Sequence, residues 1–426
     1  MNTADSLRVG AALEHIGYQP VHLPQDADVI VLNTCVVRQS AEDKAIGRLT
    51  SLKAVKKQNP DVVINLMGCL VGITDPSDLR MKFPYVDVFS KPSDPQPLVA
   101  YLTGRDRGMF DRQHLAASLL QDEETGYALP PSGSGQLVSA FLPIIYGCSH
   151  ACSYCIIPLR RGREASRPPD QILSDARTMV AQGVKEITLL GQIVDRYGQD
   201  LPGYPTLSEL ITRLHALEGL QRIRFLTSHP NWMTEDLLDN VAGLPKVMPH
   251  FELPIQAGDD AILAAMRRGY TVEKFLRIVE KIRRCFNTVS IATDLIVGFP
   301  GETDDQFQRS VELLQTLQPD MTHVARYSPR PGTPAFLNLA DDVPEAEKMQ
   351  RFRTIEKLQE AITTQINSHY LNQQVPVLFE ARSKSRWRGR TPTNKLVFAE
   401  SAENLLGQER LVSITWTGPW SMIGTV

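Results

Sequence analysis

A ten-residue stretch, Tyr146 to Cys155, constrains this chain more tightly than any other part of its sequence. It reads Tyr-Gly-Cys-Ser-His-Ala-Cys-Ser-Tyr-Cys, so three cysteines have C-x3-C-x2-C spacing directly after an apolar run typical of a buried strand. Three thiolates this close together can surround one small metal centre. They leave a four-coordinate site one protein ligand short, and an open position distinguishes a reactive metal site from a closed structural one.

Two kinds of metal centre are compatible with this spacing. An iron–sulfur cube held by Cys148, Cys152 and Cys155 would keep one iron open to a non-protein ligand. The alternative is a zinc knuckle whose fourth ligand is His150 or Cys285. Zinc fingers usually pair their ligands as two C-x2-C-like couples, and this sequence has no second couple. The spacing therefore favours the iron–sulfur centre.

The composition is that of an ordinary globular protein, with 42% hydrophobic residues, 22% charged residues and a net charge of -3. Its 426 residues are enough for two or three domains with cores of their own. No apolar run approaches the length of a membrane span, and the amino terminus lacks the basic and apolar regions of a secretory signal. Six cysteines in so long a chain form no disulfide framework, and their clustering suits metal chemistry in a reducing compartment. We therefore expect a cytoplasmic protein with no membrane association.

Residues 1–104 predict a doubly wound α/β domain. Helical and strand-like patterns alternate over residues 2–17, 28–33, 40–58 and 62–67. Cys35 and Cys69 follow the two strands, at the edge where open α/β sheets place their ligands. The alternative is that both are small buried apolar residues, which is common for free cysteine. Because such a domain normally begins with a strand, we also expect a missing amino-terminal strand whose following loop carries a third cysteine.

Residues 136–365, reached through a linker over residues 105–135, predict a partial (β/α)6 barrel. The strand-like segments are residues 141–146, 186–190, 222–227, 250–253, 289–294 and 322–326. Helical patterns lie between them, which implies parallel strands joined by right-handed crossovers. The cysteine stretch and several polar loops all follow strands. They should converge on the rim formed by the carboxyl ends of those strands, where such barrels carry their function.

Residues 366–426 change to short alternating strands that predict a small antiparallel β-barrel. Between its first two strands, residues 382–395 contain six basic residues, one tryptophan and no acidic residue. Basic side chains with an interleaved aromatic suit RNA binding by backbone neutralisation and base stacking. The alternative is a solvated charged hairpin. The candidate RNA contacts in this stretch are Arg386, Trp387, Arg388, Arg390 and Lys395.

The cysteine motif, with Tyr154 directly before its last cysteine, resembles the signature of the radical S-adenosylmethionine (SAM) superfamily. That resemblance implies a 4Fe-4S cluster whose open iron binds SAM, and an electron transfer that splits a carbon–sulfur bond to give a 5′-deoxyadenosyl radical. Residues 295–302 also resemble the superfamily's glycine- and proline-bearing segment near the adenine of SAM. Further segments are similar to methylthiotransferases within the superfamily: residues 160–167, 191–198, 226–230, 253–258, 266–271, 293–298 and 327–333. The resemblance covers nearly the whole chain, including the amino-terminal domain.

The resemblance to methylthiotransferases also implies roles for single residues. It assigns the radical SAM cluster to Cys148, Cys152 and Cys155, and a second, sulfur-donating 4Fe-4S cluster to Cys35 and Cys69. The family position of that cluster's third cysteine lies immediately before Met1. Our candidate SAM contacts are Tyr154, Gln192, Ser228, Gln256, Asp294 and Gly298. Arg160 and Arg161, just past the cysteine stretch, are candidates for binding the SAM carboxylate or RNA phosphates, unless they belong to a solvated charged turn.

Residues 226–230, and the pattern over residues 389–395 that resembles a TRAM domain, are most similar to the branch of the family that acts on isopentenylated adenosine. We therefore expect an enzyme that methylthiolates C2 of that base at position 37 of tRNA, beside the anticodon, and that consumes two SAM. The resemblance implies a flavodoxin- or ferredoxin-like electron donor and a sulfur source, and we expect a monomer. The alternatives are methylthiolation of threonylcarbamoyl-adenosine or of a ribosomal protein side chain, or a non-catalytic, metal-stabilised RNA-binding protein.

Overall fold

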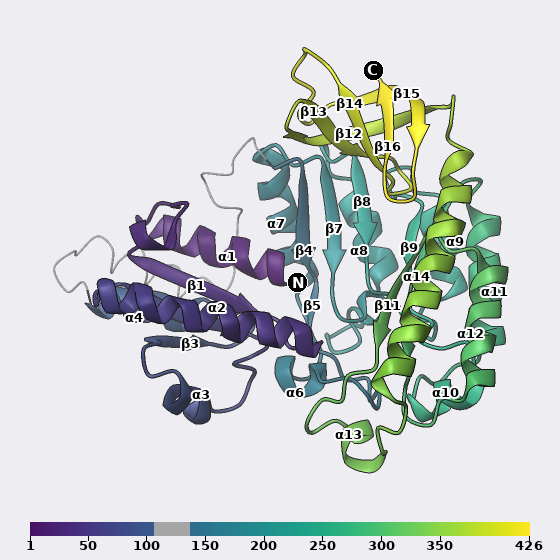
Figure 1. Cartoon of the computed structure of the whole chain (residues 1–426). Helices are drawn as coiled ribbons and strands as arrows, with labels where there is room; N and C mark the ends of the chain where they lie inside the picture. The colour runs from purple at the N-terminus through teal and green to yellow at the C-terminus, as the bar shows by residue number, and fades with distance from the viewer. Residues whose placement is uncertain (106–136) are drawn as a thin grey trace. The chain divides into compact units, whose positions relative to one another are not determined.

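The computed structural model describes residues 1–105 and 137–426 of the chain, which divides into two compact units (Figure 1). The first unit comprises residues 1–134, 141–150 and 155–182, and the second comprises residues 135–140, 151–154 and 183–426. The predicted linker, residues 105–135, lies outside the described residues apart from Arg105. None of the helices in the described ranges is both long and apolar enough to cross a membrane.

The amino-terminal part of the first unit is a parallel sheet with helices on both faces. Its elements are α1 (Asn2–His15), η1 (Pro24–Asp26), β1 (Val29–Thr34), α2 (Gln39–Gln58), β2 (Val63–Gly68), α3 (Ser77–Lys82), β3 (Val88–Ser90) and α4 (Gln96–Arg105). The strands lie in the order β1-β2-β3. Alternate residues of β2 serve opposite faces: Val63 packs with residues of α1 and α4, whereas Ile64 packs with residues of α2. The predicted doubly wound fold is confirmed, although α3 and β3 were not predicted.

The remainder of the first unit contains β5 (Ile145–Tyr146), α6 (Ile157–Arg161), β6 (Ala165–Ser166) and α7 (Pro169–Ala181). Strand β5 pairs antiparallel with β6. The prediction of one continuous strand over residues 141–146 is wrong, because the segment divides into β4 (Ser139–Pro143) and β5. At the break, the carbonyls of Pro143 and Ile144 accept hydrogen bonds from the side chain and the backbone of Arg167, at 2.9 Å each.

The second unit contains most of the predicted barrel. Its elements before the carboxyl-terminal strands are β7 (Glu186–Leu190), η3 (Val194–Arg196), α8 (Leu207–His215), β8 (Arg222–Phe225), α9 (Glu235–Ala242), β9 (His250–Glu252), α10 (Asp260–Ala265), α11 (Val272–Cys285), β10 (Ser290–Val297), α12 (Asp304–Leu317), β11 (Met321–Arg326), α13 (Pro334–Asn338) and α14 (Glu345–Ser368). Parallel pairing gives two sheets, β4-β7-β8 and β9-β10-β11. An isolated parallel bridge pairs Ile223 of β8 with Val247, three residues before β9. The partial (β/α)6 barrel is confirmed.

Short polar side chains fix where α8, α9, α10, α11 and α12 begin. The side chains of Thr206, Thr234, Asp259, Thr271 and Thr303 each accept a hydrogen bond from a backbone N–H in the first turn of α8, α9, α10, α11 and α12. Such caps satisfy donors that have no partner within the helix. Each helix therefore starts at a defined distance after the preceding strand, which holds the intervening loops at the barrel rim.

The carboxyl-terminal strands form a small closed barrel in the second unit. They are β12 (Gln374–Ser383), β13 (Arg386–Arg390), β14 (Leu396–Glu400), β15 (Glu409–Thr417) and β16 (Met422–Thr425), in the order β12-β13-β14-β16-β15. The barrel prediction is confirmed with two differences. Strand β13 lies within the basic stretch that was expected to be a loop. Strands β14 and β16 pair in parallel, whereas the other neighbouring pairs are antiparallel.

Candidate functional site

Cys35 and Cys69 lie at the carboxyl edge of the first unit's sheet, as predicted. The last residues of β1 and β2, Thr34 and Gly68, are register partners, and the two cysteines follow them directly. The Cys69 N–H donates to the Thr34 carbonyl at 3.1 Å. The side chain of Asn2 also donates to that carbonyl, at 3.2 Å, so the start of α1 lies at this same edge.

Arg161 lies beside Cys69 inside the first unit. Its Nε donates to Cys69 Sγ at 3.3 Å, and its Nη2 lies 3.1 Å from Asp5 Oδ2. Burial raises the pKa of the Cys69 thiol, while the Arg161 charge opposes that rise. The Arg161 side chain is only 4% exposed, because its donors contact the Asp5 carboxylate and the Cys69 sulfur, so it presents no surface charge to RNA phosphates in this structure. Its contact with the SAM carboxylate stays a prediction. Arg160 is partly exposed and packs against Gly72.

The first cysteine of the motif, Cys148, is buried in the first unit. Its N–H donates to the Gly162 carbonyl at 3.0 Å, and its sulfur accepts from the His150 N–H at 3.4 Å. The preceding Gly147 has φ +62, and a Cβ there would come within 2.0 Å of the Arg163 carbonyl oxygen. Only glycine tolerates that combination of conformation and close approach, so the entry to the motif is fixed by the backbone.

The second cysteine, Cys152, is buried in the second unit, where Arg268 Nη1 lies 3.0 Å from its sulfur. Hydrogen bonds to ligand sulfurs are a regular feature of iron–sulfur sites. The environments of Cys148 and Cys152 therefore fit cluster ligands. Within residues 1–105 and 137–426, no group of three or more His, Cys, Asp or Glu side chains forms a single-ion site. Cys285, the alternative zinc ligand, instead lies 3.7 Å from an Asp239 oxygen.

Two residues on the barrel rim have strained backbones. Thr227 follows β8 with φ 67 and Gln256 follows β9 with φ 77. Positive φ costs a residue with a side chain on the order of 1–3 kcal/mol and concentrates at functional sites. Both conformations are held by hydrogen bonds, from the Thr227 N–H to Glu252 Oε2 at 3.1 Å and from the Gln256 N–H to the Asp294 carbonyl at 2.9 Å.

Ser228 and Asp195 add polar groups at this rim. Ser228 is 2% exposed, and its Oγ has no hydrogen-bond partner among the described residues. A buried hydroxyl without a partner is costly, so this one fits the predicted contact with a bound cofactor. The neighbouring His229 N–H donates to Asp195 Oδ2 at 2.9 Å, and burial raises the pKa of Asp195 to about 7. Our sequence analysis missed Asp195, although it lies in the polar loop after β7.

The other predicted SAM contacts have different surroundings. Tyr154 and Gln192 are partly exposed, and Asp294 lies within β10. Gly298 donates its N–H to Glu302 at 2.6 Å, and a Cβ at its position would meet Lys348 Cγ at 2.3 Å. The close approach of Lys348 therefore explains why glycine is required there, and the SAM contact at Gly298 stays a prediction.

Two of the predicted RNA contacts point away from solvent. Trp387 is 7% exposed and belongs to the barrel core, because side-chain alternation along β13 turns it inward and its neighbours outward. Lys395 is also buried, with its Nζ 2.6 Å from Asp320 Oδ1. Neither side chain is placed to contact a nucleic acid in this structure. Arg386, Arg388 and Arg390 remain at least partly exposed.

The exposed aromatic residues of the barrel are Trp416 and Trp420, which our sequence analysis missed. Their exposed fractions are 49% and 53%. Val412 and Ile414 on the same strand point inward, so simple alternation would bury Trp416 as well. A bulge between Ile414 and Trp416 reverses the side-chain direction. The strand pattern alone therefore could not reveal this surface.

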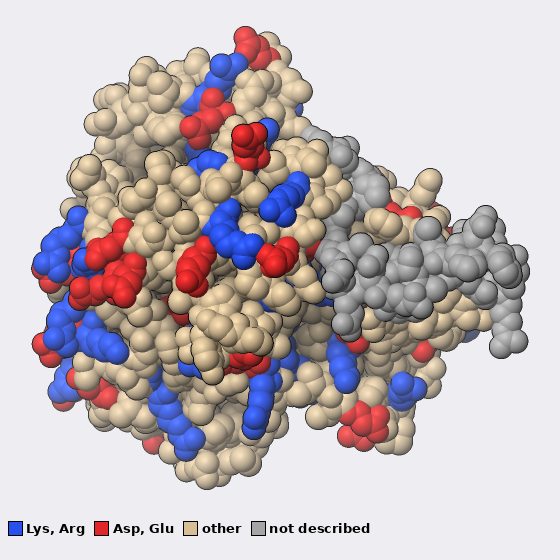
Figure 2. All heavy atoms as spheres, turned by 180° about the vertical axis from the view of Figure 1, so that it is seen from behind, with Lys and Arg blue, Asp and Glu red and all other residues tan. Residues whose placement is uncertain are grey.

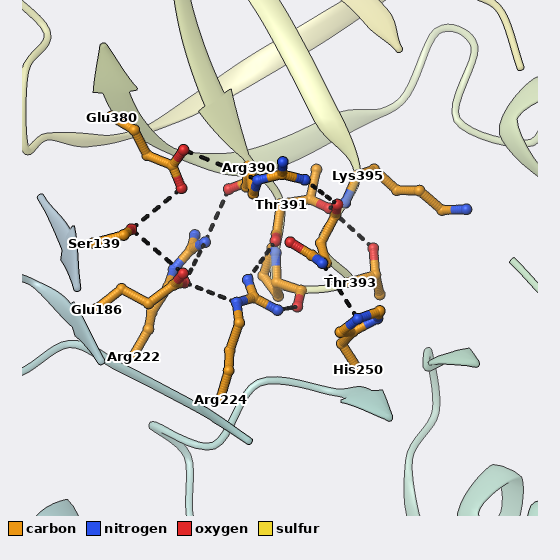
Figure 3. Close-up of polar contacts among 12 residues, drawn as sticks. Ser139, Glu186, Arg222, Arg224, His250, Glu380, Arg390, Thr391, Thr393 and Lys395 are labelled. Carbon is orange, nitrogen blue, oxygen red and sulfur yellow. Dashed lines mark hydrogen bonds and ion pairs between the residues drawn. The ribbon is translucent and has the colours of Figure 1, made fainter. Parts of the chain in front are cut away.

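Two arginines of the core hold the barrel's basic turn in place (Figure 3). Arg224 donates to the carbonyls of Thr391 and Pro392 at 2.9 and 2.8 Å, and Arg222 donates to the Arg390 carbonyl at 2.9 Å. Glu186 lies 3.0 Å from Arg224 Nε and balances its charge. The turn therefore presents its backbone to these two arginines, and Lys395 is the charged side chain that it turns inward, onto Asp320. Elsewhere, the face shown in Figure 2 mixes basic and acidic side chains, so it offers no uniformly positive surface to RNA.

Comparisons with known proteins agree with this geometry. Residues 142–314 match the model of the radical SAM superfamily, and residues 1–90 match the model of the uncharacterized protein family UPF0004. A relative from Roseiflexus sp. (strain RS-1), named tRNA-2-methylthio-N(6)-dimethylallyladenosine synthase, is 46% identical over 100% of this chain and 87% of its own length. The chain belongs to this synthase family. A relative with the same name from Herpetosiphon aurantiacus is 45% identical over 100% of this chain and 95% of its own length.

A solved structure supports the fold assignment. The cobalamin-dependent S-adenosylmethionine radical enzyme OxsB, with aqua-cobalamin and S-adenosylmethionine bound, aligns with a TM-score of 0.50 and 11% identity. The alignment covers 84% of this chain and 53% of OxsB. At this identity the likeness concerns the fold alone, and it agrees with the partial barrel described above.

Proposed function

We propose that this protein is a radical SAM enzyme that methylthiolates C2 of dimethylallyladenosine (isopentenyladenosine) at position 37 of tRNA. The observation that carries the proposal is the 46% identity over the full chain to a synthase named for this product. That match spans Cys35 and Cys69, the C-x3-C-x2-C motif and the small carboxyl-terminal barrel. A protein that only bound RNA would not need two sets of thiols, Cys35 with Cys69 and the three cysteines of the C-x3-C-x2-C motif.

Under this proposal the two sets of cysteines hold two 4Fe-4S clusters. Cys148, Cys152 and Cys155 hold the radical SAM cluster, whereas Cys35 and Cys69 contribute to the auxiliary one. When bound, the first cluster and SAM supply a 5′-deoxyadenosyl radical, and the second supplies sulfur. The electron donor is a flavodoxin- or ferredoxin-like protein, an external source replaces the sulfur, and the enzyme acts as a cytoplasmic monomer.

The chain's own residues bind and orient the reactants. Around SAM, the candidates are Tyr154, Gln192, Ser228, Gln256, Asp294 and Gly298. Ser228 offers its unpartnered Oγ, and the strained backbones of Thr227 and Gln256 fix the loops that carry them. The tRNA is held through its phosphates by Arg386 and Arg388, and through base stacking on Trp416 and Trp420.

Nucleoside analysis of tRNA tests the substrate. A deletion strain should lose the methylthio group and accumulate isopentenyladenosine, and the wild-type gene should restore the modified base, whereas a Cys152→Ala gene should not. Unchanged methylthio-isopentenyladenosine in the deletion strain would refute the assignment. A loss confined to methylthiolated threonylcarbamoyl-adenosine, or to a ribosomal protein side chain, would identify an alternative substrate.

An anaerobic assay tests the reaction class. Purified protein with SAM and a strong reductant should contain iron and release 5′-deoxyadenosine, and Cys152→Ala should release none. A protein that contains zinc and yields no 5′-deoxyadenosine would instead be a metal-stabilised RNA-binding protein.

A further inference from the structure

Arg268 is a buried cation that donates a hydrogen bond to the sulfur of a cysteine in the C-x3-C-x2-C motif. The residue is 5% exposed and lies between α10 and α11. Its Nη1 donates to Cys152 Sγ at 3.0 Å, and its Nε donates to the Tyr270 hydroxyl at 2.9 Å. No carboxylate in the described ranges forms an ion pair with it. A buried guanidinium needs a compensating negative charge; the Asp195 carboxylate acts on Arg268 without forming an ion pair, and the Cys152 sulfur is the cluster-ligand group in direct contact with it.

The surrounding hydrogen bonds keep Arg268 in this position. The turn that carries it is bonded to the residue after Cys152: the Ser153 N–H donates to the Met266 carbonyl at 3.0 Å, and Ser153 Oγ donates to the Ala265 carbonyl at 2.8 Å. On the other side, Asn231 Nδ2 donates to the Arg268 carbonyl at 3.2 Å. These bonds hold the turn that carries Arg268, and the bond to the Tyr270 hydroxyl holds the guanidinium beside the sulfur.

We propose that Arg268 is a positioning residue that raises the reduction potential of the cluster bound through Cys152. Reduction adds one electron to the cluster, and a fixed positive charge in a poorly screened interior stabilises the more negative state. A hydrogen bond to a ligand sulfur acts in the same direction. The inference rests on the proposed function only for the presence of the cluster.

Arg161 provides an internal contrast at the other cysteine site. It also donates to a sulfur, that of Cys69, but its guanidinium is shared with Asp5 and Asn2. Its charge is therefore already balanced by a carboxylate. Arg268 has no such partner in the described residues, so the effect of removing the charge should be larger at Cys152.

A redox titration monitored by electron paramagnetic resonance tests the proposal. The protein carries Cys35→Ala and Cys69→Ala, so that one cluster contributes, and no tRNA is added. At a fixed potential, Arg268→Gln should lower the ratio of reduced to oxidised cluster about tenfold, which for a one-electron couple is a shift of about 59 mV. Arg268→Lys, which keeps the charge, should shift it less. The matched control is Arg267→Gln, because the adjacent Arg267 is exposed.

Two results would overturn the proposal. One is an Arg268→Gln midpoint equal to that of Arg267→Gln while both variants retain the cluster iron. The other is loss of the cluster iron from both Arg268→Gln and Arg268→Lys. If only Arg268→Gln loses its iron, the charge that lysine retains is what the cluster needs; if both lose it, the role of Arg268 is purely structural. Because no tRNA is present, a failure of the proposed methylthiolation would leave this titration unaffected.

Discussion

Replacing Glu186 by glutamine should destabilise the attachment of the small barrel to the core. Glu186 is buried and lies 3.0 Å from Arg224 Nε and 3.9 Å from Arg222 Nη1. In Glu186→Gln, Arg222 keeps its ion pair with Glu409, whereas Arg224 keeps only two backbone carbonyls. Removing one partner of a buried ion pair costs about 3–5 kcal/mol. Since Arg224 retains those two hydrogen bonds, we expect a loss near the lower end, about 3 kcal/mol.

Urea unfolding followed by tryptophan fluorescence measures this loss where it occurs, because three of the four tryptophans, Trp387, Trp416 and Trp420, belong to the barrel. With a typical urea dependence of about 1–3 kcal/mol per M, the midpoint of Glu186→Gln should fall by roughly 1–3 M. The matched control is Glu400→Gln, whose ion pair with Arg386 is 42% and 69% exposed and should contribute less than about 1 kcal/mol. Equal midpoints for the two variants would refute the role of the buried network.

Three further predictions concern the barrel and its contacts. Burial lowers the pKa of His250 from 6.5 to about 3, so between these values the unfolded chain binds the proton more readily than the folded one. The stability that His250 contributes is therefore present above pH 6.5 and should fall by about 2 kcal/mol at pH 5. Because Asp195, whose pKa burial raises to about 7, adds stability as the pH falls over the same range, the test compares wild type with His250→Gln by urea unfolding at pH 7 and 5: the wild type should lose about 2 kcal/mol relative to the variant, and equal pH dependence of the two would exclude His250. Trp387→Ala removes a buried core side chain and should lower barrel stability by about 3–5 kcal/mol, whereas unchanged unfolding would place that ring outside the core. Trp416→Ala should weaken tRNA binding by about 1–3 kcal/mol at fixed salt in a filter-binding assay, and Leu411→Ala, an equally exposed apolar change on the same strand, should not; equal losses would argue against base stacking.

Much of the fold follows from local patterns in the sequence. Continuous apolar runs mark parallel strands that are buried on both faces, and they predicted β1 and β2 to within about a residue at each end. Because the carboxyl ends of neighbouring parallel strands meet at one edge, the same runs placed Cys35 beside Cys69. Apolar residues that recur every three to four positions likewise predicted the helices between the barrel strands.

The remaining features depend on contacts between residues far apart in the chain. Arg268 is separated from Cys152 by 116 positions, and no periodic pattern connects them. Arg161 belongs to a basic segment that predicts exposure, yet Asp5 and Cys69 draw it into the interior. In the barrel, a one-residue bulge decides that Trp416 faces solvent. The effect of such a bulge is set by strand pairing.

The position of β16 has a consequence for how the chain is made. This strand lies between β14 and β15, yet it is the last of the five to be synthesised. Until residues 422–425 emerge from the ribosome, β14 and β15 each present an unpaired edge, which is a template for association with another chain. A released chain that ends shortly before Met422 would therefore expose two open strand edges, and truncated forms of this length should be especially prone to aggregate.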